Sequence, residues 1–153
     1  LVAELLGALT LTEVDTTRFF RALIEVNPNA LPDDGLPAAL TGSFYTPDRL
    51  PDGFVRRLRD WIGAWAARLD ADGVDDATRR TLMASTNPWI IPRNYLLQEA
   101  INAAAAGDLA LLETLMTAIR EPYGEQPEHG HLAARRPDWA RHAPGCSALS
   151  CSS

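Results

Sequence analysis

The last part of the sequence gathers most of the side chains that could bind a metal ion or act as a nucleophile. These side chains are His129, His131, His142, Cys146 and Cys151. Imidazole and thiolate groups are common zinc ligands, so a zinc site is one interpretation. The spacing argues against it, because the segment holds no Cys-x2-Cys pair and no His-x3–5-His pair. We therefore interpret the histidines as part of a solvated segment and expect no bound metal.

Cys151 is the more informative of the two cysteines. It lies third from the end between Ser150 and Ser152, where burial is difficult, and an exposed thiol ionises and exchanges readily with other thiols. An incidental free cysteine is an equally simple interpretation. A local Cys146–Cys151 bridge is a third, although so small a loop would stabilise the fold little. The residues alone leave these alternatives open.

Arg93 and Asn94 follow a turn bracketed by Pro88 and Pro92 and open a helical pattern. Exposed, they could hold an anion at the start of that helix. We favour a structural interpretation, in which Arg93 pairs with a carboxylate and Asn94 caps the helix. No nucleophile–base constellation such as Gly-x-Ser-x-Gly is present, so the sequence itself offers no catalytic residue.

Composition excludes several classes of site. All 14 cationic residues are arginine, so a P-loop, a Schiff-base lysine or a kinase-type strand lysine cannot be complete here. The net charge of −6 disfavours a nucleic-acid partner, and no apolar run is long enough to span a membrane. With only two cysteines, the expected compartment is the reducing cytoplasm.

The elements that would position these residues are helices, and the expected fold class is all-α. Apolar residues recur at helical spacing in 1–9, 54–69, 93–106 and 109–119. Two further helices are expected where a capping residue precedes such a pattern: one begins after a cap at Thr10 or Asp15, and the other runs from a cap at Asp75 or Asp76 to residue 83. Prolines and glycines predict an irregular surface insertion over about 27–51. We expect a helical subdomain over 1–120 and an extended, irregular tail over 121–153, anchored by Trp139.

Two helices carry specific packing predictions. In the helix after Pro51, one apolar stripe should face the core, formed by Phe54, Leu58, Trp61, Trp65 and Leu69. Gly107 and Asp108 should join two antiparallel helices into a hairpin, Gly107 as the C-terminal stop and Asp108 as the N-cap. In the second helix of this hairpin the predicted buried residues are Leu109, Leu112, Leu115, Met116 and Ile119.

An ordered set of short motifs resembles the C-terminal part of the selenoprotein O family, also called the YdiU family. The set runs through nearly the whole chain: Glu13-Val14-Asp15-Thr16-Thr17, Phe19-Phe20-Arg21, Asn87-Pro88, Arg93-Asn94-Tyr95-Leu96 with Gln98, Gly107-Asp108, Pro122-Tyr123 with Glu125, Gln126-Pro127, Pro137-Asp138-Trp139-Ala140 and Cys151-Ser152-Ser153. No single motif is specific, but their order is.

The resemblance implies the helical C-terminal portion of a protein-kinase-like fold and a protein adenylyltransferase activity. Such enzymes transfer AMP from ATP to Ser, Thr or Tyr hydroxyls of proteins, with Mg²⁺ or Mn²⁺. The family's catalytic and ligand-binding motifs match no position here, so we expect the active site upstream of Leu1, ATP and metal bound by the longer enzyme, and no cofactor bound by this chain. The start at Leu1 rather than Met fits a fragment of such an enzyme.

One role is implied for a residue of this chain. In some family members the position of Cys151 is a selenocysteine, also followed by two serines. In others the terminal cysteine forms a disulfide with the kinase-like activation segment. Cys151 is thus the expected redox residue, and the expected partners are the upstream kinase-like domain and protein substrates. The alternative is an independent helical interaction module without catalytic activity.

Overall fold

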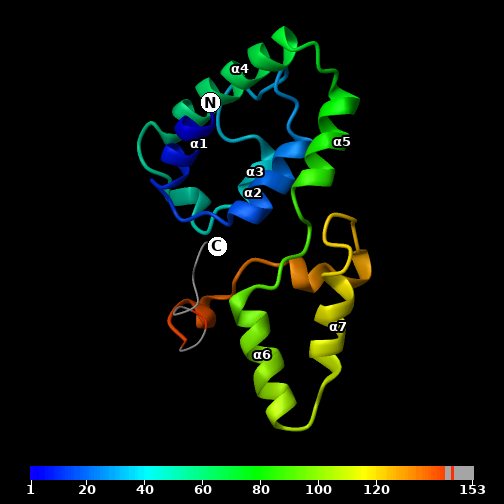
Figure 1. The fold of residues 1–153 in the computed structure, drawn as a ribbon. Helices are drawn as coiled ribbons and strands as arrows, with labels where there is room; N and C mark the ends of the chain where they lie inside the picture. Colours follow the sequence, from blue (N-terminus) through cyan, green and yellow to red (C-terminus); the bar gives the residue numbers. More distant parts are fainter. Residues whose placement is uncertain (144–145, 147–153) are drawn as a thin grey trace. The chain divides into compact units, whose positions relative to one another are not determined.

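The structure, a computed structural model, describes residues 1–143 and 146. It divides into two compact units, Leu1–Ala84 and Ser85–Ser153. Within the described residues the regular structure is helical, with one isolated bridge between Val14 and Phe44 and no strand, so the all-α prediction is confirmed (Figure 1). In that same part of the chain no helix combines the length and apolar character needed to cross a membrane.

The elements of the first unit are joined by irregular connections. In chain order they are α1 (Val2–Leu9), α2 (Thr16–Ala22), the 3₁₀ helix η1 (Leu23–Glu25), α3 (Ala38–Thr41), the 3₁₀ helix η2 (Pro47–Arg49), α4 (Phe54–Ala71) and α5 (Asp76–Thr86). Asp15 is the cap of α2, because its Oδ1 accepts from the Arg18 amide at 3.0 Å. The Thr10 hydroxyl instead donates back to the Gly7 carbonyl at 2.9 Å. This decides between the two predicted caps.

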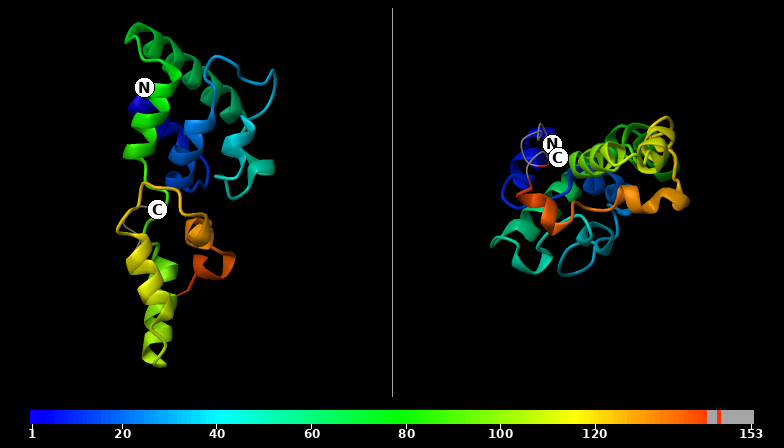
Figure 2. Two further views of the ribbon diagram at one scale, coloured as in Figure 1. Left: turned by 90° about the vertical axis from the view of Figure 1, so that its right-hand side faces the viewer. Right: turned by 90° about the horizontal axis from the view of Figure 1, so that it is seen from below.

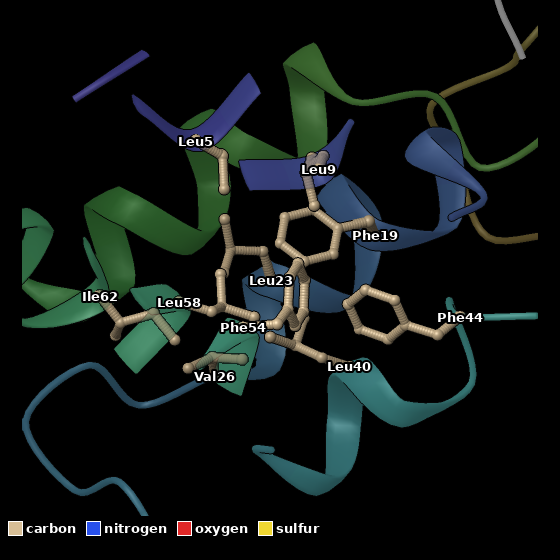
Figure 3. Packing of buried hydrophobic residues seen from close by; sticks show 10 residues of the cluster. All are labelled: Leu5, Leu9, Phe19, Leu23, Val26, Leu40, Phe44, Phe54, Leu58 and Ile62. Atoms are coloured by element: carbon tan, nitrogen blue, oxygen red, sulfur yellow. The ribbon is translucent and has the colours of Figure 1, made fainter. Parts of the chain in front are cut away.

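An aromatic and aliphatic cluster forms the core of the first unit. Figure 3 shows its members: Leu5, Leu9, Phe19, Leu23, Val26, Leu40, Phe44, Phe54, Leu58 and Ile62. The Phe44 ring packs edge-to-face on Phe19 and Phe54, with centroids 6.1 Å and 5.5 Å apart. Segment 27–51 holds no helix longer than the four-residue α3 and is otherwise irregular as predicted, but it is not only a surface insertion. Its Leu40 and Phe44 are completely buried, and between them the Ser43 carbonyl accepts from the Asp15 amide at 2.8 Å.

The long helix α4 buries a different stripe from the one its tryptophans suggest. Phe54 and Leu58 are buried as predicted, but the stripe continues through Ile62 and Ala66. Trp61 and Trp65 are half-buried and stack on each other, with centroids 5.8 Å apart. The large indoles therefore border the core, while smaller side chains at a spacing of four residues fill it.

The second unit is built on a helical hairpin of α6 (Asn94–Ala105) and α7 (Ala110–Ala118), which lie side by side in Figure 1. Gly107 ends α6 with φ +89°, a conformation that L side chains rarely adopt. The Asp108 carboxylate accepts from the Ala110 amide at 2.9 Å. The hairpin and its Gly107–Asp108 connection are thus present, but the prediction that Asp108 is the N-cap was wrong, because the N-cap of α7 is Leu109 and Asp108 lies one residue before it.

The face of α7 that meets the core is narrower than predicted. Leu115 and Ala118 are buried, and Ile119 is half-buried. The other predicted core residues are exposed: Leu109 by 50%, Leu112 by 39% and Met116 by 49%. Ala100 of α6 is buried in the same cluster, so the hairpin packs through small side chains and leaves a broad apolar arc of α7 outside.

Residues 121–143 are not an extended tail. They form the 3₁₀ helices η3 (Pro127–Ala133) and η4 (Asp138–Arg141), which lie toward the end of the hairpin opposite its connecting loop (Figure 2). Leu132 and Ala140 are buried in the same cluster as α6 and α7. Trp139 remains 52% exposed, with its ring edge-on to Tyr95. The chain passes from the first compact unit to the second between residues 84 and 85, and the predicted boundary at residue 120 falls inside the second unit.

Candidate functional site

The residue predicted to carry redox chemistry, Cys151, lies outside the described residues. Its redox role stays a prediction. The other thiol, Cys146, is described and is only 5% exposed. Its side chain belongs to the core cluster of the second unit with Tyr95, Leu96 and Ala140, and it forms no disulfide with any described residue. Cys146 therefore behaves as a small apolar core residue, a common role for a free cysteine.

Main-chain bonds and a side-chain amide hold the chain at Cys146. Its backbone N–H donates to the Ala143 carbonyl at 3.1 Å. Its carbonyl oxygen accepts from Nδ2 of Asn94, the first residue of α6, at 3.5 Å. The chain at residue 146 is thus tied to the start of a helix 52 residues earlier in the sequence.

Asn94 does not cap α6, contrary to the prediction. The cap position belongs to Arg93, which makes no side-chain cap bond, and the Asn94 amide is directed to Cys146 instead. Arg93 is buried, with 7% of its surface exposed. That burial argues against an open anion-binding role for Arg93. Pairing of Arg93 with a carboxylate stays a prediction.

The three histidines differ in exposure, although His129 and His131 both belong to η3. His129 is half-buried within η3, whereas His131 and His142 are exposed. Among residues 1–143 and 146, no group of three or more His, Cys, Asp or Glu side chains could hold a metal ion.

The most elaborate polar constellation of the described chain surrounds Arg79 of α5, which the sequence did not single out. This guanidinium is 3% exposed and donates to the carbonyl of Ile24 at 3.0 Å and to Asp76 Oδ1 at 2.6 Å. A longer bond of 3.5 Å reaches the Leu23 carbonyl. Its Cζ also lies 5.3 Å from the Trp65 ring centroid, within cation–π range.

The carboxylates at the start of α5 are held in their charged form. Hydrogen bonds from Arg79 and then Arg80 lower the pKa of Asp76 below its ordinary value of 3.8. The pKa of Asp75 is lowered chiefly because its carboxylate accepts from the Thr78 amide, as a helix cap does. Since these groups bind one another and the backbone, the constellation fastens α5 to η1 and α4. It places no nucleophile beside a base, so it supports no catalytic step.

In the sequence, the Asp-x2-Arg-Arg spacing of residues 76–80 is the one pattern that could have indicated these ion pairs. Asp76 bonds residues three and four positions later, the neighbours on a helix surface. Nothing local indicates that one arginine is buried and the other exposed. That difference depends on the carbonyls of Leu23 and Ile24, more than fifty residues earlier.

Comparison with known proteins shows relatives along the full chain. The chain is 47% identical over 153 residues to a protein nucleotidyltransferase YdiU of Methylobacillus flagellatus. It is 42% identical over 153 residues to the protein of that name from Azoarcus sp. (strain BH72), and 37% identical over 174 aligned residues to that of Nitrosospira multiformis. The chain belongs to the YdiU family. No protein-family model matches it.

The alignments cover all of this chain but only a part of each YdiU relative. That part is 29% of the Methylobacillus protein, 28% of the Azoarcus protein and 31% of the Nitrosospira protein. The chain therefore spans less than a third of the length of the curated relatives it matches. The relatives' name gives a nucleotidyltransferase activity, and most of the length of each such protein lies outside the aligned segment.

The residues of this chain do not fit the nucleotide and metal that the YdiU resemblance implies. The sequence has no lysine to meet a triphosphate, and the described carboxylates form no cluster that could hold Mg²⁺ or Mn²⁺. The best-placed carboxylate, that of Asp76, is already bonded by two guanidinium groups.

Proposed function

We propose that this chain is the C-terminal helical portion of a protein adenylyltransferase. The full enzyme would transfer AMP from ATP to Ser, Thr or Tyr hydroxyls of protein substrates in the cytoplasm. Its kinase-like domain, with the ATP and Mg²⁺ or Mn²⁺ sites, would lie upstream of Leu1 and be a partner of this chain. The observation that carries the proposal is that the whole chain aligns, at 37% to 47% identity, with YdiU nucleotidyltransferases that are about three times as long.

A second part of the proposal concerns regulation. Cys151, followed by Ser152 and Ser153, would exchange with a thiol of the upstream domain and so make the activity sensitive to oxidants. The burial of Cys146 in the core supports this assignment, because it removes the neighbouring thiol as a competing reactive group.

The activity is tested by labelling the α-phosphate or the γ-phosphate of ATP and asking which label reaches the protein substrate. The reading frame upstream of Leu1 is determined, and the continuous polypeptide is expressed with Mg²⁺ or Mn²⁺ and a mixture of protein substrates. We expect label on protein hydroxyls from ATP carrying ³²P at the α-phosphate and none from ATP carrying it at the γ-phosphate. Transfer of γ-label would instead identify a kinase, and saturable Mg·ATP binding by residues 1–153 alone would contradict an upstream site.

The apolar arc of α7 gives the alternative function its one supporting observation. Leu109, Leu112 and Met116 lie on one side of that helix and are 39% to 50% exposed. Such a surface suits a protein contact, either to the rest of a longer chain or to a separate partner. A start codon directly before Leu1 would favour an independent interaction module. A continuous upstream frame encoding lysine- and aspartate-bearing segments would favour the enzyme.

A further inference from the structure

The chain contains three Asp-Gly pairs, at residues 34–35, 52–53 and 72–73. An aspartate followed by glycine is prone to isomerise through a succinimide, because glycine carries no side chain to hinder attack by its amide nitrogen. All three pairs are exposed, and their glycines share a positive φ of +78°, +75° and +66°. Sequence and exposure therefore do not distinguish the pairs, and the difference between them lies in how the main chain is held.

The pair 72–73 is held at the C-terminal end of α4, where Asp72 is the C-cap. The Gly73 amide, whose nitrogen would attack, donates to the Asp70 carbonyl at 3.1 Å. The Asp72 carboxylate, which would be attacked, accepts from Arg68 Nε at 2.6 Å. Isomerisation at this pair therefore requires that the chain first opens locally.

The pair 52–53 is held at the start of the same helix. Gly53 is the N-cap of α4, and its carbonyl accepts from the Arg57 amide at 2.9 Å. The Phe54 amide donates to the Pro51 carbonyl at 3.0 Å, which closes a turn around the pair. This pair also reacts only after a local opening, because the turn and the first turn of α4 fix its main chain.

The pair 34–35 lies in a stretch without such main-chain support. Among the described residues, no backbone carbonyl accepts from a main-chain amide of residues 33–36. The stretch is instead anchored on both sides. Leu31 and Leu36 pack against the core cluster of the first unit, and Arg59 donates to the Pro32 carbonyl. The pair forms the open part between these anchors.

We propose that Asp34 is a site of spontaneous isomerisation and that the resulting isoaspartate is a substrate for an isoaspartyl carboxyl methyltransferase. The Gly35 nitrogen attacks Cγ of the protonated Asp34 carboxyl, so that an N–Cγ bond forms and the Cγ–OH bond breaks. The hydroxyl leaves as water with the amide proton. Water then opens the succinimide, at Cγ to restore aspartate or at the main-chain carbonyl to give isoaspartate. The elemental composition of the product equals that of the starting chain.

The isoaspartate offers a free α-carboxylate on the surface of a folded unit. Its main chain runs through Cβ and Cγ, which places one additional atom between Leu31 and Leu36. The exposed stretch between these anchors accommodates that atom without moving the core. A methyltransferase can then form an O–CH₃ bond at the α-carboxylate as the S–CH₃ bond of S-adenosylmethionine breaks, which releases S-adenosylhomocysteine.

The test incubates the 153-residue chain at about pH 6, where a small fraction of an exposed carboxyl is protonated. An isoaspartyl methyltransferase with methyl-labelled S-adenosylmethionine then counts isoaspartate, and electron-transfer fragmentation of peptides locates it among the three pairs. We expect the folded chain to isomerise at 34–35 at least roughly tenfold faster than at 52–53 or 72–73, because the latter must open first. In denaturing urea the three rates should become similar.

Two matched variants assign the label. Asp34→Glu keeps the charge but would require a six-membered ring, so it should remove most of the methyl label from the folded chain. Asp52→Glu makes the same change at a supported pair and should leave the label unchanged. Circular dichroism establishes that both variants fold. Equal rates at the three pairs in the folded chain, or full label in Asp34→Glu, would overturn the proposal.

Discussion

Arg79 connects three parts of the first unit through a single side chain. Its guanidinium bonds the Leu23 and Ile24 carbonyls of η1, pairs with Asp76 in its own helix and lies over the Trp65 ring of α4. A planar group with five donors suits this position, because it satisfies acceptors in several directions without a rotatable ammonium. Arg80, one residue later, pairs with Glu25 and Asp76 while 37% exposed. The neighbouring arginines thus allow a matched comparison.

Replacing Arg79 by alanine should destabilise the first unit strongly. The variant loses the cation–π contact and leaves the buried carbonyl of Ile24 without its donor, so we expect a loss of about 2 to 4 kcal/mol in the free energy of unfolding. Arg80→Ala should cost at most about 1 kcal/mol, because exposed ion pairs contribute little. Urea unfolding followed by circular dichroism measures both. Equal effects would show that Arg79 acts only as a surface ion pair.

The first turn of α5 should also be sensitive to acid. The folded pKa values of Asp75 and Asp76 lie below 3.8, so their contribution to stability is complete above that value and is lost as the pH falls through the lower folded values. We expect thermal midpoints to fall as the pH drops below about 4, and Asp76→Asn to flatten part of this dependence. Melts across this range provide the measurement. An unchanged slope in the variant would exclude Asp76 as a source of the acid sensitivity.

At the scale of elements, local chemistry predicted the ends of helices better than the faces that pack. Asp15 starts a helix and Gly107 stops one because a short carboxylate or a left-handed glycine is a local requirement. The faces depend on neighbours. Segment 27–51 has too many prolines for a long helix, but its composition could not show that Leu40 and Phe44 fold back into the core.

The helix α7 illustrates this limit. Its apolar residues cover most of the circumference, so periodicity alone does not decide which half faces α6. The choice is made by packing through Ala100, Leu115 and Ala118. Likewise, the pattern placed Cys146 in a solvated tail because its burial depends on Leu132 and Ala140, whose 3₁₀ turns leave little trace in sequence periodicity.

Substitution of two leucines of α7 should therefore change the free energy of unfolding by very different amounts. Leu115→Ala removes a side chain that is 2% exposed and should cost about 2 to 4 kcal/mol of unfolding free energy. Leu112→Ser, at a site 39% exposed, should change that free energy by no more than about 0.5 kcal/mol. Denaturant melts of residues 1–153 compare them. A large loss for Leu112→Ser would mean that the exposed arc is covered within this chain.

For the whole molecule, the feature that should determine how the chain unfolds is that the buried hydrophobic residues form separate clusters, one within each unit. The cluster of the first unit draws on residues between Leu5 and Met83, and that of the second on residues between Trp89 and Cys146. Cooperative unfolding follows shared burial, so each cluster should behave as its own cooperative unit. The described part of the chain would then hold two separately stabilised bodies.

This separation is tested by weakening one core at a time. Phe44→Leu alters a completely buried ring of the first cluster, and Leu132→Ala truncates a completely buried side chain of the second. Hydrogen exchange resolved by peptide should show faster exchange across residues 1–84 for the first variant and across residues 85–143 for the second, by roughly tenfold or more for a loss above about 1.4 kcal/mol. Faster exchange throughout the chain in both variants would contradict independent units, since it requires that the clusters unfold together.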